Sequence, residues 1–361
     1  MRGRYVAALV AAAAVAFALL WHSRTVTTNP PAASPTATEN RGVLVISPTE
    51  DVPSDLAGVR YLLLDGSKAS KIGALKQRYP GLKVLAYKDL SFFVDYSTND
   101  RGNAAVPWSQ ASLNESWFLH DPGGSRVRSI RYPHSWFADV GQASYQTAWE
   151  LNVLSFLRKA PWDGVFIDDA LADPGWHLGG AYGRLARYPS RDAYRAAERS
   201  MLAATAPHLQ RAGYLVIANI AASRRQLDVW SDWPRLLSGA MREHFLKYGK
   251  GGERVLTGKA WRHDVAIERA VEGVGRVFIG LSYGPRRYAK AQGFVRASFL
   301  LFDDPETRSA TIWSPEAGKA AKLDLGLPQG PPVRHGKVWT RPFQRGTLRV
   351  NPRRGTYAVK R

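Results

Sequence analysis

The feature of this sequence that most restricts its fold is a regular alternation of short apolar runs and helical patterns, which begins at Gly42. Eight runs of four to seven residues have strand character, and amphipathic helical patterns separate most of them. Strands that are apolar along their length are typical of a parallel sheet with both faces covered. The eight strands are predicted at 42–46, 61–65, 83–87, 164–168, 214–218, 239–245, 276–282 and 310–313.

The helical patterns between these strands favour a closed α/β barrel. Apolar residues recur with helical spacing at 68–79, 144–159, 191–211, 261–271 and 289–301. Eight parallel strands fit a (β/α)8 barrel of the TIM type, which occupies about 250 residues, whereas a doubly wound sheet would have fewer strands in another order. No glycine-rich phosphate loop follows the first strands, which argues against a nucleotide-binding sheet. The first two strands are too close for a full intervening helix, so we expect an irregular start.

The N-terminal residues 1–21 have the pattern of an export segment. Arg2 and Arg4 precede an apolar run of 17 residues from Tyr5 to Trp21. A removable signal usually has an apolar region of about 7–15 residues, and a membrane-spanning helix needs about 17–25. No small-x-small cleavage site follows the run. We therefore favour an uncleaved membrane anchor, with a cleaved signal peptide as the alternative, and expect the body at the extracellular face of the membrane or secreted.

The rest of the chain divides into three segments by composition. Residues 22–41 are rich in Pro, Thr, Ser and Ala, and predict an extended linker. The barrel is expected at 42–315. A small antiparallel β unit is expected at 316–361, because short alternating runs there are separated by Gly and Pro turns. These runs are 323–326, 338–340, 346–350 and 356–359.

Composition and charge narrow the function classes. The chain has no cysteine, which excludes disulfides, thiolate nucleophiles, cysteine-bound zinc and iron–sulfur clusters. The formal charge of +20 would attract polyanions, with the tail after Arg341 as the densest basic stretch. Most arginines are spread along the chain, which favours an ordinary solvated surface, so we expect no nucleic-acid partner. We expect a monomer without cofactor or metal.

Polar residues at the predicted strand ends indicate the chemistry. In a (β/α)8 barrel the reacting groups lie at the C-terminal ends of the strands. Here those ends carry mainly carboxylates, amides and hydroxyls, together with Lys88 and His244. Glycoside hydrolysis needs such a set, because one carboxyl protonates the leaving oxygen while another attacks the sugar or activates water.

Asp168 and Glu243 are the expected catalytic pair. Two adjacent acids, Asp168 and Asp169, end the strand 164–168, and an unpaired charge there would be costly. Side chains alternate along a strand, so only one of the two can face the barrel interior. The spacing from Asp163 to Asp168 resembles the nucleophile strand of several barrel glycosidases, so we assign Asp168 to catalysis and Asp169 to substrate binding. A structural alternative is an acid that caps a loop or pairs with an arginine, such as Glu243 with Arg242.

A tryptophan-rich segment follows the third predicted strand. Six of the 12 tryptophans lie between residues 108 and 176. Sugars present apolar faces that stack on aromatic rings, so we expect Trp117 and Trp136 near the site, although large rings also dominate protein cores. Asp139 lies close to them in sequence and is a third carboxylate candidate. The complete expected substrate-binding set is Asp169, Asp139, Tyr87, Lys88, Trp117, Trp136, Asn219 and Tyr283.

An ordered series of segments resembles a known family. The series comprises Pro80–Leu90, Trp117–His120, Trp136–Gly141, Tyr145–Trp149 and Trp162–Asp169. Together they resemble a family of hypothetical glycosyl hydrolases described as "family 15-like", which is distinct from the glucoamylases and distantly similar to the endo-polygalactosaminidases. The resemblance runs from about residue 61 to the C-terminus, and implies a TIM-type barrel that acts on an extracellular polysaccharide.

The resemblance also implies a Glu-Glu pair in the sixth strand. This chain departs from it with Arg242-Glu243, which leaves Glu243 as the acid carried over. Two hypotheses follow: a glycoside hydrolase that uses Asp168 and Glu243, or a non-catalytic glycan-binding or wall-associated protein on a degenerate barrel. The feature that separates them is whether Glu243 faces Asp168 across the barrel mouth. A weaker third hypothesis is a polyanion-binding surface protein that uses the basic tail.

Overall fold

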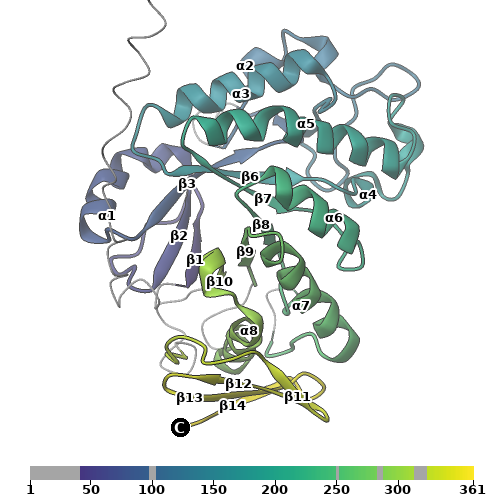
Figure 1. The fold of residues 1–361 in the computed structure, drawn as a ribbon. Helices are drawn as coiled ribbons and strands as arrows, with labels where there is room; N and C mark the ends of the chain where they lie inside the picture. Colours follow the sequence, from purple (N-terminus) through teal and green to yellow (C-terminus); the bar gives the residue numbers. More distant parts are fainter. Residues whose placement is uncertain (1–40, 97–102, 249–251, 283–287, 313–322) are drawn as a thin grey trace, which may run out of the picture. The chain divides into compact units, whose positions relative to one another are not determined.

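A closed parallel barrel forms the body of the protein (Figure 1). The computed structural model describes residues 41–96, 103–248, 252–282, 288–312 and 323–361. Eight strands close in the order β1-β10-β9-β8-β7-β6-β3-β2, so the predicted TIM-type barrel is confirmed. The barrel strands are β1 (Gly42–Ile46), β2 (Val59–Leu64), β3 (Lys83–Asp89), β6 (Gly164–Ala170), β7 (Leu215–Ile220), β8 (Gly239–Arg242), β9 (Val277–Gly280) and β10 (Ala310–Ile312).

Helices lie outside the barrel and connect most of its strands (Figure 1). The longest is α5 (Arg191–Arg211), whose bounds match the prediction. Residues 47–58, between β1 and β2, form turns without a helix, as the short sequence separation predicts. The other barrel helices are α1 (Ile72–Arg78), α3 (Ala143–Leu157), α6 (Leu227–Asp232), α7 (Gly258–Glu272) and α8 (Ala289–Phe302).

The predicted anchor, residues 1–21, and all of the predicted linker except Arg41 lie outside the described residues. Within the part of the chain that the structure describes, no helix combines the length and the apolar character needed to cross a membrane.

Two apolar cores flank the barrel wall. The inner core fills the barrel with one set of alternate side chains, including Leu85, Phe166, Ile217 and Met241. The outer core fills the space between the strands and the helices with the other set. Because side chains alternate along a strand, the residues two positions beyond these four inner ones lie on the inward side, at the C-terminal end of the barrel. Those residues are Tyr87, Asp168, Asn219 and Glu243.

The long segment between β3 and α3 builds a lobe beside the barrel mouth. A two-stranded hairpin of β4 (Phe92–Val94) and β5 (Ser135–Phe137) organises it. Two short helices also belong to this side, α2 (Trp108–Ala111) and, after β6, α4 (Gly175–Leu178). No strand or helix was predicted within this segment from the sequence.

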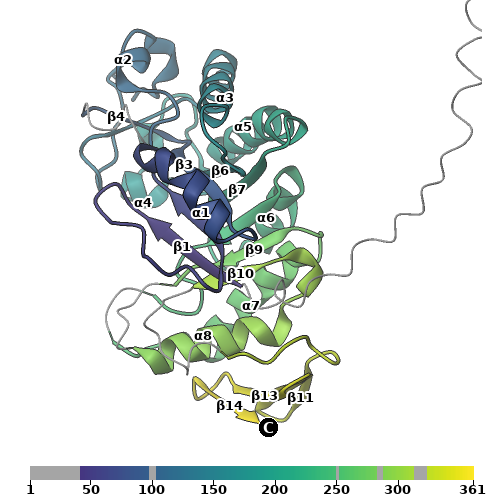
Figure 2. The same cartoon turned by 90° about the vertical axis from the view of Figure 1, so that its left-hand side faces the viewer.

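The C-terminal strands form a separate antiparallel sheet, which confirms the predicted β unit. The sheet packs on α8, on the side away from the barrel strands (Figure 2). The expected run 323–326 is not a strand, because Gly326 has a φ of 71° and the chain turns there. The predicted boundary near residue 315 lies outside the described residues. The strands are β11 (Val333–His335), β12 (Val338–Phe343), β13 (Gly346–Asn351) and β14 (Thr356–Lys360).

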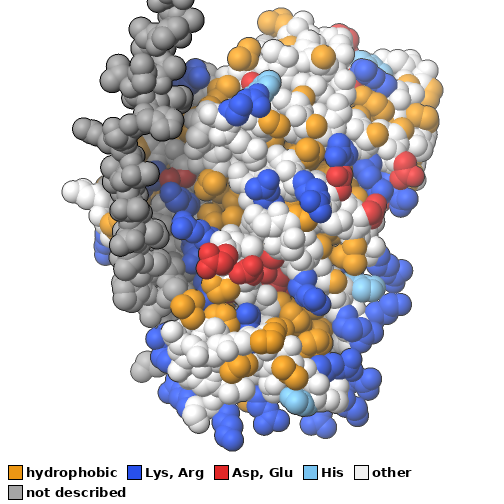
Figure 3. Space-filling model, viewed as in Figure 1, with side chains coloured by type: hydrophobic (Ala, Val, Ile, Leu, Met, Phe, Trp, Pro, Cys, Tyr) orange, Lys and Arg blue, Asp and Glu red, His pale blue; other side chains and the backbone are white. Residues whose placement is uncertain are grey.

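The surface of this sheet is strongly basic. Residues 323–361 contain nine Lys or Arg residues and one acidic residue, Asp324. Figure 3 shows Lys and Arg side chains along the lower part of that face, over the C-terminal strands. The positive charge is therefore more concentrated in space than the spread of arginines along the sequence indicated.

Arg341 links the C-terminal sheet to helix α8 of the barrel. Its guanidinium is almost fully buried, and Nη1 donates to the carbonyls of Leu300 (2.9 Å) and Asp303 (2.8 Å) at the end of α8. Nε donates to the carbonyl of Gly330 at 3.1 Å. A cation that satisfies the last carbonyls of a helix stabilises the helix end.

We expect Arg341→Ala to lower the free energy of unfolding by about 3 kcal/mol, because buried carbonyls lose a charged donor. The matched control is Arg349→Ala, which removes an exposed arginine of β13 and should change stability by less than about 0.5 kcal/mol. Urea denaturation of the full chain measures both. Equal effects of the two substitutions would contradict the anchoring role of Arg341.

Candidate active site

A single amide group connects the two predicted catalytic acids at the barrel mouth. Asn219, at the end of β7, donates from Nδ2 to Oδ1 of Asp168 (2.9 Å) and to Oε2 of Glu243 (3.3 Å). Both distances end at one nitrogen atom, so these two carboxylate oxygens are separated by at most the sum of the two distances. The structure thus brings together three predicted site residues from three adjacent strands.

Asp168 is held by donors from three directions. The Tyr87 hydroxyl on β3 donates to Oδ2, while Oδ1 accepts the Asn219 amide and the backbone N–H of Asp169 at 2.9 Å. The pKa of Asp168 is raised to about 6, chiefly by burial; the Asn219 hydrogen bond lowers it and the negative charge of Glu243 raises it. The carboxylate is fixed in position and ionised at neutral pH.

Glu243 lies just beyond β8 and is more open to solvent, with its side chain 37% exposed. Its neighbour Arg242 points out of the barrel, where its Nε lies 3.7 Å from Asp264 on α7 and Nη1 donates to the carbonyl of Ala222. The alternative pairing of Glu243 with Arg242 is therefore not formed. The departure from the expected Glu-Glu pair falls on the outward position of the strand and leaves the inward acid in place. His244 lies beside Glu243, with its Nε2 at 3.9 Å from Oε1.

Backbone strain is concentrated at the two strand ends that carry the acids. Asp169 has a φ of 54°, and the register between β6 and β7 shifts between Ile167 and Ala170. Beyond β8, His244 and Leu246 have φ values of 58° and 55°. Such conformations are uncommon for residues other than glycine and persist where surrounding contacts enforce them, often at functional sites.

Two further acids, Glu198 and Asp89, form hydrogen bonds that hold the chain at the ends of β6 and β3. Glu198 on α5 is fully buried, and its Oε1 accepts the backbone N–H of Leu171 and the hydroxyl of Ser91 at 3.0 Å each. The same Ser91 hydroxyl lies 2.6 Å from the carbonyl of Asp169. Burial raises the pKa of Glu198 to about 8. Asp89 caps the turn after β3 by accepting the N–H groups of Ser91 and Phe92, and burial raises its pKa to about 7.

The role of Glu198 was not predicted from the sequence. An acid on the otherwise apolar face of a predicted helix was the available signal, since Glu198 shares its face with Tyr194, Met201 and Leu202. Ser91 gave no such signal, because its role arises only when β3 and β6 lie side by side.

Asp169 faces a group of rings rather than the barrel interior. An oxygen of its carboxylate lies 4.0 Å from Nε2 of His177, on α4. His177 is buried, which lowers its pKa to about 4, so its ring is neutral at physiological pH. The rings of Tyr132 and Trp176 lie next to His177, with centroids 5.9 and 4.9 Å from it. Neither ring was predicted from the sequence as a substrate contact.

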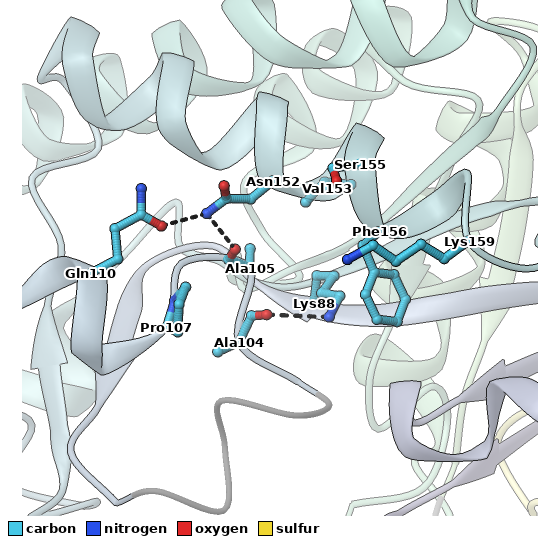
Figure 4. A pocket seen from close by; sticks show the side chains of 10 residues that line it. All are labelled: Lys88, Ala104, Ala105, Pro107, Gln110, Asn152, Val153, Ser155, Phe156 and Lys159. Atoms are coloured by element: carbon cyan, nitrogen blue, oxygen red, sulfur yellow. Dashed lines mark hydrogen bonds between the residues drawn. The ribbon is translucent and has the colours of Figure 1, made fainter.

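Lys88 is not brought to this group of acids. It follows Tyr87 on β3 and therefore points to the opposite side, into a pocket between β3, α2 and α3 (Figure 4). Its ammonium donates to the carbonyl of Ala104 at 3.2 Å and lies 3.7 Å from the ring centroid of Phe156. Burial lowers the pKa of Lys88 to about 8.

Asp139 also has structural partners of its own. Its two carboxylate oxygens are engaged by the guanidinium of Arg187 and by the hydroxyl of Tyr188, the latter at 2.7 Å. The Asp139 side chain is buried by these contacts. It therefore holds the lobe to the segment that precedes α5.

The two selected tryptophans contact the lobe rather than the acids. Trp117 is buried and donates to the Ser144 hydroxyl, and Trp136 donates to Asp95, each at 2.9 Å. Trp136 lies on the face of β5 opposite to Phe137, the residue that contacts His177. Tyr283, the remaining predicted residue, lies outside the described residues. Within the described ranges, no three His, Asp or Glu side chains are grouped as they would be to hold a metal ion.

The raised pKa of Asp168 has a consequence for stability. The folded carboxyl holds its proton to about pH 6, and an unfolded aspartate only to about pH 3.9. Its contribution to stability is therefore complete below pH 4 and is lost as the pH rises through 6. We expect Asp168→Asn to stabilise the full chain by roughly 2 kcal/mol at pH 7 and to have little effect at pH 4.

Urea denaturation at both pH values tests this expectation. Asp192→Asn, an exposed acid of α5, is the control and should show no such pH dependence. A loss of stability at pH 7 in Asp168→Asn would contradict the desolvation penalty assigned to this carboxyl.

Comparison with known proteins assigns the chain to a family. None of the curated proteins matches this chain. The fold is similar to the glycoside hydrolase domain of PelA from Pseudomonas aeruginosa, with 18% identity, a TM-score of 0.49, and coverage of 79% of this chain and 96% of that one. It is also similar to Ega3 from Aspergillus fumigatus, solved in complex with galactosamine, with 10% identity, a TM-score of 0.46, and coverage of 78% and 93%. Residues 76–347 match the family described as "Hypothetical glycosyl hydrolase family 15", so the chain belongs to that family of glycosyl hydrolases.

Proposed function

We propose that this protein hydrolyses an extracellular or cell-wall polysaccharide, with Asp168 as nucleophile and Glu243 as general acid and base. Membership of a glycosyl hydrolase family supports the reaction class. The observation that carries the residue assignment is the Asn219 amide, which hydrogen-bonds both acids and so holds them on the two sides of one small space. A degenerate glycan-binding barrel would have no need to keep two acids so close together.

The short separation of the acids supports a retaining mechanism. Carboxyl groups lie about 5–5.5 Å apart in retaining enzymes and 6.5–9.5 Å apart in inverting enzymes, which must fit a water between them. The two Asn219 distances, 2.9 and 3.3 Å, keep one oxygen of Asp168 near one oxygen of Glu243, as the shorter separation of a retaining enzyme requires. In the first step Asp168 bonds to the anomeric carbon while the glycosidic oxygen leaves with the proton of Glu243. In the second step Glu243 takes a proton from water, whose oxygen displaces Asp168.

The surroundings of each acid suit these roles. Three donors aimed at Asp168 stabilise its ionised form and hold it still for attack. Glu243 is more exposed, so a leaving group and then a water molecule can reach it. Asp168 must be ionised to attack, so activity is expected to fall as the pH drops through about 6.

The cellular setting is proposed from the sequence alone. The apolar run from Tyr5 to Trp21, with Arg2 and Arg4 before it, supports export and tethering to the membrane. We propose that the barrel acts as a monomer at the outer face of that membrane, where cell-surface polysaccharides are present.

Hydrolysis of a panel of bacterial exopolysaccharides and wall glycans, followed through new reducing ends, tests the function. We expect the parent chain to release reducing ends from at least one polymer. Asp168→Asn and Glu243→Gln should lower kcat/KM by at least 10³-fold, because each removes a group that acts in the transition state. Asp192→Asn should retain full activity.

The anomeric form of the first product, read by proton NMR, tests the mechanism on the same polymer. Retention of configuration is expected, and inversion would contradict the proposed nucleophile. Full activity in Asp168→Asn would exclude the assigned pair. Binding of polymers without any release of reducing ends would favour the non-catalytic hypothesis.

A further inference from the structure

An exposed apolar patch lies beside Asp169 at the barrel mouth. Its members are large side chains on the lobe and on α4 that remain half exposed: Ile130 (51%), Tyr132 (51%) and Trp176 (55%). The rings of Tyr132 and Trp176 meet edge to face, with centroids 5.7 Å apart. Exposed apolar patches of this kind mark binding surfaces more often than single exposed residues do.

Hydrogen bonds hold the patch in shape before any ligand arrives. The Ser129 hydroxyl lies 3.0 Å from Nδ1 of His177 and accepts the backbone N–H groups of Arg131 and Tyr132. The backbone N–H of Ile130 donates to the carbonyl of His177 at 2.9 Å. The two chain segments are thus tied together, so little side-chain and loop freedom remains to be lost on binding.

Arg131 orients the indole of Trp176. Its Nε donates to the carbonyl of Trp176 at 3.2 Å, and its guanidinium carbon lies 5.4 Å from the ring centroid. A planar cation near the indole fixes the ring while leaving more than half of the side chain open to solvent.

The patch is continuous with the acids. His177 contacts both exposed rings and its Nε2 lies 4.0 Å from the Asp169 carboxylate, which directly follows Asp168. Partial burial raises the pKa of the Tyr132 hydroxyl, and the nearby negative charges of Asp169 and Glu243 raise it further, which agrees with a place beside both acids.

We propose that Tyr132 and Trp176 form a stacking subsite for a pyranose ring of the substrate, next to the acids but outside the position of bond cleavage. This inference rests on the proposed glycoside hydrolase function. An open aromatic surface with hydrogen-bonding groups at its edge suits a sugar, whose ring has apolar faces and a polar rim. A subsite outside the cleaved bond contacts only oligosaccharides and polymers, so it specifies a polymeric substrate over a simple monoglycoside.

Chain-length dependence of binding and turnover tests the subsite. The probes are hexasaccharides and disaccharides from cellulose, chitosan and polygalacturonate, together with any polymer that the parent chain cleaves. Binding is measured by calorimetry in the Asp168→Asn chain, which separates recognition from hydrolysis. The variants, made in both backgrounds, are Tyr132→Ala, Trp176→Ala and the ring-conserving Tyr132→Phe and Trp176→Phe. Leu151→Ala, which trims a 58% exposed side chain of α3, is the matched control.

We expect each alanine variant to weaken binding of the long probe and raise its KM roughly ten-fold, with kcat nearly unchanged, because a stacked ring contributes about that much affinity. The disaccharide should be unaffected, and the phenylalanine variants should keep most of the affinity. Leu151→Ala should match the parent.

The remaining outcomes distinguish a failure of the proposed subsite from a failure of the proposed hydrolase function. Cleavage of a polymer by the parent chain with unchanged KM in both alanine variants would overturn the subsite alone. Binding that depends on the two rings without cleavage would contradict the hydrolase and retain the subsite. Failure of the parent to bind or cleave any probe would overturn both. A parent dimer that becomes monomeric in the alanine variants, seen by sedimentation, would assign the patch to self-association and overturn the subsite.

Discussion

The alternation of side chains along parallel strands is the constraint on which both the core and the site depend. Closing eight such strands turns one set of alternate side chains inward, where Phe166 and Ile217 fill the barrel. The same alternation carries Asp168 and Asn219 to the inward side at the carboxyl ends of β6 and β7. The apolar residues earlier in each strand therefore fix the direction of the polar residue at its end. The packing of the core and the placement of the site residues thus depend on the same alternation of side chains.

The acids impose a free-energy penalty that the surrounding structure offsets. Desolvation raises the pKa values of Asp89, Asp168 and Glu198, so each is less stable as an anion in the fold than in water. Backbone N–H groups, hydroxyls and the Asn219 amide satisfy several of their oxygens. The positive φ values near β6 and β8 add strain at the same place. Such a concentration of penalties at one end of a barrel is typical of a site maintained for function.

The sequence predicted the barrel and the inward acids because these depend on local periodicity. Eight apolar runs gave the strands, and strand-end position gave Asp168, Asn219 and Glu243. The same periodicity would have placed Lys88 outside the barrel once Tyr87 was assigned to the inside. Lys88 was predicted as a site residue from its position at a strand end alone, without regard to the alternation of side chains along the strand. Arg242 follows the same rule, since its position next to Glu243 makes it an outward residue.

Other parts of the site depend on contacts between distant segments and left no local signal. Asp139 meets Arg187 only when the lobe folds against the segment before α5. The aromatic pair of Tyr132 and Trp176 comes from a loop of the lobe and from α4, which the Ser129–His177 hydrogen bond links. Tryptophan content alone selected Trp117 and Trp136, which stabilise the lobe. Packing between segments, rather than composition, decides which rings remain exposed.

Catalysis by Asp168 and Glu243 requires that the two carboxyl groups lie close enough to act on one glycosidic bond. The most direct measurement is the pKa of Asp168, followed by carbon-detected NMR, in the parent chain and in Glu243→Gln. The negative charge of Glu243 raises the pKa of Asp168, so neutralising that charge should lower the midpoint of the Asp168 titration from its value near 6. An unchanged midpoint would show that the two carboxyl groups do not interact, and would contradict the proposed catalytic pair.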